Sequence, residues 1–188
     1  MKESSIIIPD LMTAEFNIAI AEGVAARSGL AAIFISGEIT GELRGPDGRL
    51  IRRRIDRNLV VTNGLNHVGQ RIIAGDTSGL GDIIDRMSIG DVDTAAAAGQ
   101  TNLQGSLLAA QAMDANYPSR SGAVVTFKCT YAAGTGTGTV KEAALFNNAV
   151  TGTINVDYFM LARAVIGPYT KGAGDSLALT WTWTFSAS

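Results

Sequence analysis

Between residues 176 and 186 the chain alternates without a break between large apolar side chains and small or hydroxylated ones. The apolar positions are Leu177, Leu179, Trp181, Trp183 and Phe185. A period of two is the signature of a β-strand, because successive side chains of a strand point to opposite faces. One face of this segment is therefore expected in a core and the other at the surface, as in an antiparallel sheet. We expect both tryptophans to be core residues.

Similar patterns recur through most of the chain. Residues 33–43 and 50–61 read as two strands joined by a Gly-Pro-Asp-Gly turn, in which proline presets φ and glycine accepts positive φ. These segments predict a long hairpin. Further strands are expected at residues 86–90, 123–131, 140–147 and 155–166, and one short helix at residues 65–74. Residues 102–113 show no clear period.

These elements predict a mainly β protein, an antiparallel β-sandwich or jelly roll with one short helix and an N-terminal arm. We expect residues 31–188 to form the sandwich and residues 1–30 to contact neighbours as an arm or helix. Phe16, Ile20 and Val24 have helical spacing within residues 13–27. An ordinary first helix of the domain and an extended arm that docks on a neighbour both remain open for this segment.

Composition excludes several classes of partner. Only 17% of the residues are charged, and 15 lysines and arginines against 17 aspartates and glutamates give a net charge of −2. Such a chain lacks the positive field that holds nucleic acid or an anionic membrane, so we expect neither as a partner. The apolar run Ile6-Ile7-Ile8 stops at Pro9, which is too short for a signal peptide. The low charge suggests instead that much of the surface faces other protein.

The histidine and the cysteine that could act in nucleophilic catalysis read as structural here. The chain has one histidine and one cysteine, which excludes an internal disulfide and a Cys/His zinc cluster. His67 lies in the expected helix, and no Gly-x-Ser-x-Gly elbow accompanies it. Cys129 alternates with Phe127 and Tyr131 on an apolar strand face, which favours a buried and inert thiol.

Two further patterns resemble ligand sites only in part. The aspartates at positions 82, 85, 91 and 93 lack the spacing of a calcium-binding loop. The alternating glycines and threonines of residues 134–139 lead into a strand, whereas a phosphate-binding loop opens a helix. We therefore expect no catalytic residue, metal, cofactor or small-molecule substrate, and no enzyme activity.

Arginines concentrate in residues 44–57, and no aromatic residues alternate with them to form a base-stacking platform. Planar guanidinium groups suit a protein interface with acidic patches. The apolar N-terminus and the small-residue segment 95–113 are expected to meet neighbouring subunits as well. The interface residues predicted by name are Ile6, Ile7, Ile8, Leu11, Phe16, Arg52, Arg53 and Arg54.

The order of several segments resembles a known group of proteins. Asn-Leu-Val-Val-Thr-Asn-Gly-Leu at 58–65 precedes a short helix, Met-Ser-Ile-Gly-Asp follows at 87–91, and Val-Lys-Glu-Ala-Ala-Leu-Phe-Asn stands at 140–147. The chain then closes with Gly-Asp-Ser-Leu at 174–177 and Trp-Thr-Trp-Thr-Phe at 181–185. Together they resemble the small β-sandwich virion proteins of tailed bacteriophages, which include capsid decoration (cement) proteins and jelly-roll domains of head or tail fibres. Residues 105–110 depart from the resemblance, since they are apolar where that group usually carries charge.

The resemblance implies a structural virion protein without enzyme activity, most concretely a capsid decoration protein. Such a protein would be made in the host cytoplasm and would sit on the outer capsid surface. Its partners would be the major capsid protein and further copies of itself, as a homo-oligomer and most simply a trimer. The alternative is a tail or head fibre or adaptor module that binds a host surface or connects virion parts. That alternative would use aromatic residues on loops, for which Tyr117 and Tyr169 are the candidates.

Overall fold

The computed structural model describes residues 33–72, 83–147 and 159–187, which are mainly in strands. The described elements are β1 (Ile33–Arg44), β2 (Leu50–Arg57), β3 (Leu59–Val60), α2 (Thr62–Ile72), β4 (Ile84–Gly90), β5 (Leu107–Ala112), β6 (Ser119–Ser121), β7 (Val124–Tyr131), β8 (Gly138–Asn147), β9 (Phe159–Lys171) and β10 (Ser176–Ala187). The predicted N-terminal arm, residues 1–30, lies outside the described residues, whereas residues Ile35–Phe185 form a compact unit.

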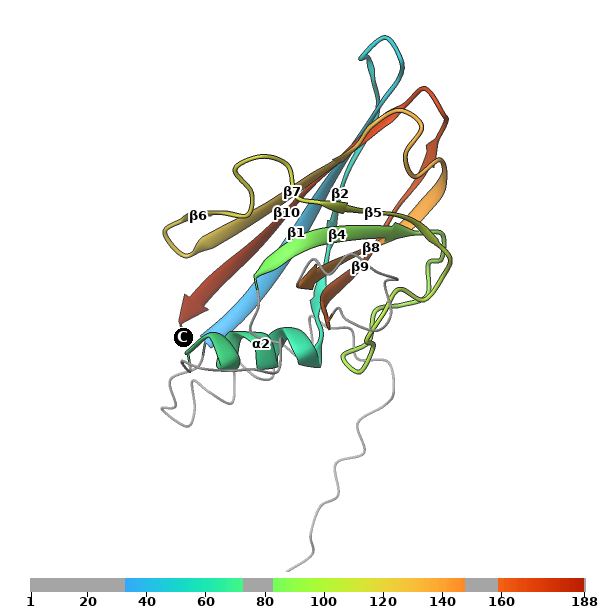
Figure 1. Ribbon diagram of the computed structural model, residues 1–188. Helices are drawn as coiled ribbons and strands as arrows, with labels where there is room; N and C mark the ends of the chain where they lie inside the picture. The colour runs from blue at the N-terminus through green and yellow to red at the C-terminus, as the bar shows by residue number, and fades with distance from the viewer. Residues whose placement is uncertain (1–32, 73–82, 148–158, 188) are drawn as a thin grey trace, which may run out of the picture. The chain divides into compact units, whose positions relative to one another are not determined.

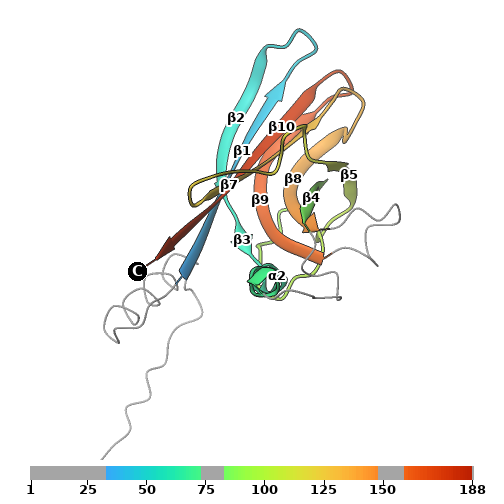
Figure 2. The same cartoon turned by 60° about the vertical axis from the view of Figure 1, so that its left-hand side comes forward.

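The strands make two antiparallel sheets of five strands each (Figures 1 and 2). Sheet A has the order β2-β1-β10-β7-β6, and sheet B has the order β3-β9-β8-β4-β5. Helix α2 lies at one end of sheet B, beside β3 and β9 (Figure 2). The predicted class, a mainly β antiparallel sandwich with one short helix, is confirmed.

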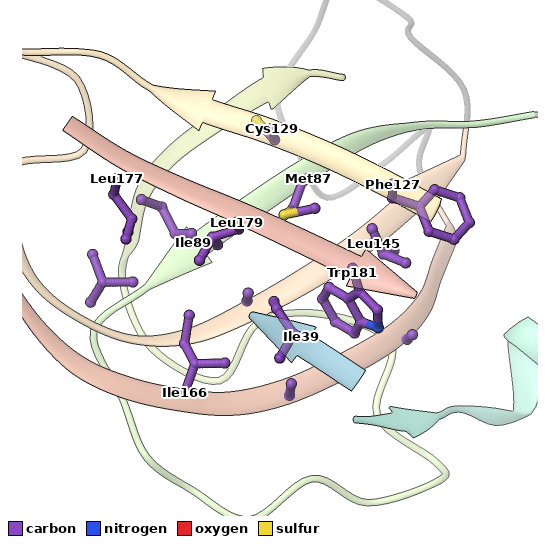
Figure 3. Close-up of a cluster of buried hydrophobic side chains, with 14 of the residues drawn as sticks. Ile39, Met87, Ile89, Phe127, Cys129, Leu145, Ile166, Leu177, Leu179 and Trp181 are labelled. Atoms are coloured by element: carbon purple, nitrogen blue, oxygen red, sulfur yellow. The ribbon is translucent and has the colours of Figure 1, made fainter. Parts of the chain in front are cut away.

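The core lies between the two sheets. In Figure 3, side chains of β10 and β7 in sheet A face those of β4, β8 and β9 in sheet B. The alternation of β10 is confirmed, since Trp181 is fully buried and Trp183 is 2% exposed. Trp183 meets Phe127 edge to face, with ring centroids 5.5 Å apart. The burial of apolar side chains on these facing surfaces is the main stabilising term of the sandwich.

One run of backbone belongs to both sheets. β2 pairs with β1 in sheet A, and after Asn58 the same run pairs with β9 in sheet B, where Leu59 lies opposite Arg163. The Asn58 amide still donates to the carbonyl of Gly37 at 3.2 Å, so the strand leaves sheet A only beyond that bond. The sequence predicted a single strand over residues 50–61, and the structure divides it at Asn58.

Sheet B is covered on its outer face as well. A second, smaller apolar cluster lies there and comprises Val61, Ala144, Phe146 and Met160, with Leu103 packed against it. Leu103 belongs to the connection of residues 91–106 between β4 and β5, which we call the cover loop. Strand β8 at the middle of sheet B is therefore buried on both faces, and Ala143–Phe146 is a continuous buried run rather than an alternating one.

One segment that the sequence left unassigned forms a strand, and one expected strand end is wrong. Residues 107–112, which showed no clear period, form strand β5 at the edge of sheet B. A break was expected after residue 166, yet β9 continues through Gly167 and Pro168 to Lys171. The pairing of β8 with β9 shifts register at this point and Gly167 has φ +72°, so the two residues form a bulge inside the strand.

Candidate protein-interaction surface

The hairpin of β1 and β2 ends in a well-bonded turn. The Gly48 amide donates to the Gly45 carbonyl at 2.9 Å, and the Arg49 amide donates to Asp47 Oδ1 at 3.0 Å. Gly48 has φ +77°, a conformation that favours glycine. Pro46 lies one residue into the turn, where its fixed φ fits. The turn chemistry predicted from the sequence is confirmed, and it fixes the register of the two strands.

Strand β2 exposes an unusual amount of apolar surface for a strand of this sandwich. Leu50, Ile51 and Ile55 are 44%, 52% and 50% exposed. Arg53 stands between the two isoleucines along the strand, and its side chain is 53% exposed. Exposed large apolar side chains that are contiguous and flanked by arginine are typical of protein-interaction surfaces. We call Leu50–Ile55 the β2 strip.

The arginines of this hairpin are held in defined positions by partners in the same chain. On β1, Glu42 accepts a hydrogen bond from Arg44 at 2.9 Å, and it lies 3.5 Å from Arg53 Nε on β2. Glu42 and Arg53 are also opposite each other in the β1–β2 register. Such exposed pairs contribute only about 0–1 kcal/mol each to stability. Their effect is to orient the Arg53 guanidinium beside the two isoleucines.

A second set of contacts ties β2 to the bulge of β9. Arg54 Nε lies 2.6 Å from Asp56 Oδ1, and Asp56 Oδ2 accepts a hydrogen bond from the Gly167 amide at 3.3 Å. Arg54 also donates to the carbonyl of Gly167. The two side chains thus satisfy both backbone groups of Gly167 and hold β2 against sheet B.

Tyr169 adds a further contact beneath the hairpin. The Arg52 guanidinium lies 5.7 Å from the centre of the Tyr169 ring, and the Tyr169 hydroxyl donates to the Gly41 carbonyl at 3.2 Å. Burial, and then the nearby Asp56 carboxylate, raise the pKa of Tyr169 to about 12. The phenol is therefore neutral and acts as a hydrogen-bond donor at physiological pH.

The predicted interface residues have different outcomes. Arg52, Arg53 and Arg54 lie together on one strand and all three are exposed, but by strand alternation only Arg53 shares a face with Ile51 and Ile55. Arg52 and Arg54 turn towards β9. The N-terminal residues of the prediction, Ile6, Ile7, Ile8, Leu11 and Phe16, lie outside the described residues. The sequence pattern did not single out Ile51 and Ile55, although apolar residues that alternate with arginine on an edge strand were a usable signal.

The cover loop, which overlaps the small-residue segment expected to meet neighbours, is fixed within the chain by a buried ion pair. Arg163 Nε lies 2.7 Å from Glu142 Oε2, and both side chains have no exposed surface. Arg163 also donates to the Thr94 carbonyl at 2.8 Å, and Glu142 accepts the Gly105 amide at 2.8 Å. The pair therefore joins two neighbouring strands of sheet B to both ends of the loop above them.

Cys129 and His67 are placed as the sequence predicted. Cys129 is fully buried on β7 between Phe127 and Tyr131, and its thiol lies 3.6 Å from the Ala112 carbonyl. His67 is buried in α2, where it lines an apolar pocket of about 390 Å³. The other residues lining that pocket are Val68, Ile83, Ile84, Pro118, Val125, Phe127, Trp183 and Phe185.

The buried Cys129 thiol predicts a loss of stability in alkaline solution. Burial raises its pKa from 9.0 to about 12. A raised pKa means that the folded state favours the neutral thiol, so its contribution to stability is complete below pH 9.0 and is lost as pH rises towards about 12. The free energy of unfolding, measured by urea titration, should fall more steeply across this range in the wild type than in Cys129→Ala. Equal slopes for the two proteins would contradict the assignment.

The acidic positions do not assemble into a metal site within the described residues, since no three histidine, cysteine or carboxylate side chains converge there. Asp91 accepts the Ser106 amide at 2.8 Å, and Asp93 lies 3.5 Å from Lys141 Nζ. Asp82 is outside the described residues. In the part of the chain that is described, no helix has the length and apolar character needed to cross a membrane.

The glycine–threonine segment of residues 134–139 lies in the connection between β7 and β8, as predicted, except that its last two residues already belong to β8. All three of its glycines, Gly134, Gly136 and Gly138, have positive φ, and the segment leads into a strand. Its backbone is bonded within the chain, with the Gly134 amide donating to the Ala173 carbonyl at 2.7 Å.

The candidate site is therefore the β2 strip. Contacts of Arg52, Arg54 and Asp56 with β9 hold the strand in place, and Glu42 positions the Arg53 side chain. Comparison of the chain with protein-family models, with curated proteins and with solved structures found no match. The resemblance to phage virion proteins therefore stays a prediction from the sequence.

Proposed function

We propose that this chain is a structural virion protein, most concretely a capsid decoration protein that binds and stabilises the assembled head of a tailed phage. The observation that carries the proposal is the β2 strip, where Leu50, Ile51, Arg53 and Ile55 are exposed on a hairpin held rigid by its own contacts. A surface of this kind suits binding to another protein. The sequence resemblance supplies the identity of that protein, the major capsid protein.

The mechanism is one of selective binding. A protein that binds the assembled shell, and not its separated subunits, stabilises the shell in proportion to the free energy of binding. A rigid hairpin suits this task because little conformational entropy is lost when it binds. The Glu42–Arg53 pair and the Tyr169–Gly41 hydrogen bond supply that rigidity.

Decoration is favoured over the fibre alternative by the position of one aromatic residue. Tyr169 was expected on a loop, where it would contact a host surface, but it is buried in β9 beneath the hairpin. Tyr117 is partly buried beside Lys128, whose ammonium lies 5.9 Å from the ring centre. The most exposed apolar side chains of the hairpin are aliphatic, as expected for a protein interface more than for a glycan site.

The proposal is tested by mixing the purified chain with shells that lack their decoration protein. We expect the chain to sediment with intact shells, to remain in solution with unassembled capsid subunits, and to raise the temperature at which the shells disrupt. Light scattering of the free chain should give the mass of a trimer. Equal binding to shells and to separated subunits, or no retention by shells, would refute the decoration proposal.

The N-terminal arm can be tested in the same assay. A variant without residues 1–12 should keep the circular dichroism spectrum of the β domain and be retained less strongly by the shells. This part of the proposal rests on the apolar run Ile6-Ile7-Ile8. Retention equal to that of the full chain would remove the arm from the proposed interface.

A further inference from the structure

Strand β2 is an edge of sheet A, and β1 is its neighbour in that sheet. In an antiparallel pair, alternate residues turn their N–H and C=O groups away from the partner strand. The Asn58 amide bonds to Gly37, and the register pairs Asp56 with Ile39 and Arg54 with Gly41. By this alternation, the backbone groups of Arg53 and Ile55 point away from β1. These are groups to which a further strand can bond.

The charge of β2 argues against pairing with a second copy of itself. The strand carries four arginines and one aspartate, in a chain whose net charge is −2. Because Arg52, Arg53 and Arg54 are consecutive, antiparallel pairing of two β2 strands about their centre brings arginines opposite or diagonal to arginines. Like charges at such positions destabilise a sheet. A self-paired edge is therefore disfavoured, whereas an acidic strand complements it.

The outer face of the β2 strip specifies the side-chain pattern of the complementary strand. On the outer face Ile51, Arg53 and Ile55 alternate apolar, basic and apolar. Cross-strand neighbours on one face of a sheet interact directly, and unlike charges at these positions are favourable. The matching outer face of a partner strand is apolar, acidic and apolar. Its acidic side chain then lies within reach of Arg53, which Glu42 holds in place.

We propose that β2 binds an extended acidic segment of a partner protein, which adds to sheet A as a sixth strand and presents apolar, acidic and apolar residues at alternate positions on one face. Backbone hydrogen bonds provide binding, and the Arg53 charge provides selectivity. The inference rests on the proposed function only for the identity of the partner as a capsid component.

The test uses the full-length chain and three fluorescent peptides. The first is a seven-residue strand that has valine, glutamate and valine at alternate positions with threonine at the others, so that these three side chains share one face. The second has lysine in place of the glutamate, and the third is the glutamate peptide with alternate backbone nitrogens methylated. Binding is followed by fluorescence polarisation at low ionic strength. We expect the glutamate peptide to bind, and the lysine and N-methylated peptides to bind at least about tenfold more weakly.

A matched pair of variants locates the site. Arg53→Glu reverses the charge on the proposed edge, and Arg120→Glu does so on β6, the opposite edge of the same sheet. Binding of the glutamate peptide should weaken at least about tenfold in Arg53→Glu and stay unchanged in Arg120→Glu. The inference is overturned if the glutamate and lysine peptides bind equally or not at all, if N-methylation has no effect, or if the two variants behave alike.

The peptide test and the shell test can refute the two proposals independently of each other. If the glutamate peptide binds as described but shells do not retain the chain, the acidic-strand site stands and the decoration proposal fails. If shells retain wild type and Arg53→Glu equally, and the peptides do not discriminate, the decoration proposal stands and β2 is not its interface.

Discussion

Replacing Arg163 by methionine should lower the free energy of unfolding by about 3–5 kcal/mol. The substitution removes the guanidinium and leaves the Glu142 carboxylate buried without its ionic partner, 0% exposed beneath the cover loop. An uncompensated buried charge is among the most costly defects in a protein interior. The same change frees the Thr94 carbonyl and the Gln100 side chain, which Arg163 holds at 2.8 and 3.2 Å. Equilibrium urea unfolding followed by tryptophan fluorescence measures the effect.

Two further variants show whether the buried charge is the cause. Glu142→Leu combined with Arg163→Met removes both charges, and the double variant should lose less stability than the sum of the two single losses. Lys141→Met serves as the control, because its pair with Asp93 is 3.5 Å long and the Asp93 side chain is 68% exposed. That control should change the free energy of unfolding by less than about 1 kcal/mol. A loss for Arg163→Met no larger than for Lys141→Met would show that the pair does not stabilise the fold.

Gly64→Ala should destabilise the protein by about 1–3 kcal/mol, although alanine is the better helix former. Gly64 lies in the first turn of α2, where the helix meets β9. A Cβ atom at this position would lie 2.1 Å from the Leu161 carbonyl oxygen and 2.7 Å from a methyl group of Val60. The first of these is backbone of β9 and cannot rotate away. The helix would have to shift away from β9.

The control for this prediction is Gly99→Ala in the cover loop, where no heavy atom lies within 4 Å of the added Cβ. We expect no loss of stability for it, and a thermal melt of the three proteins gives the comparison. If Gly64→Ala were as stable as the wild type or more so, helix propensity would outweigh packing. The close contact of α2 with β9 would then be wrong.

Alternation in the sequence predicted sheet A better than sheet B. Strand β10 has one face in the core and one outside, so its apolar period of two is visible in the sequence and was confirmed in the structure. Strand β5 was not recognised, since Leu107-Leu108-Ala109-Ala110 does not alternate. The buried run Ala143–Phe146 is likewise a consequence of the cover loop on the outer face of sheet B. Local periodicity does not reveal such a cover.

The contacts that fix the candidate site join distant parts of the chain. Arg54 and Gly167 are separated by 113 residues, and Tyr169 and Gly41 by 128. The sequence identified the arginine concentration, but these long-range contacts determine which arginines lie beside the exposed isoleucines and which contact β9. The sequence therefore indicated the strand on which the candidate site lies. Only the fold shows that Arg53 lies beside the exposed isoleucines, whereas Arg52 and Arg54 contact β9.

The run of backbone shared by the two sheets has a mechanical consequence. Because Leu50–Arg57 and Leu59–Val60 are covalently continuous, tension applied to the open edge of one sheet passes directly along the chain into the other. The contacts of Arg54 and Asp56 with Gly167 link the same two sheets close to this shared strand. Separating the sheets there therefore requires several hydrogen bonds to break together. A load on the β2 strip is therefore carried by both sheets at once, and β2 resists separation from either of them.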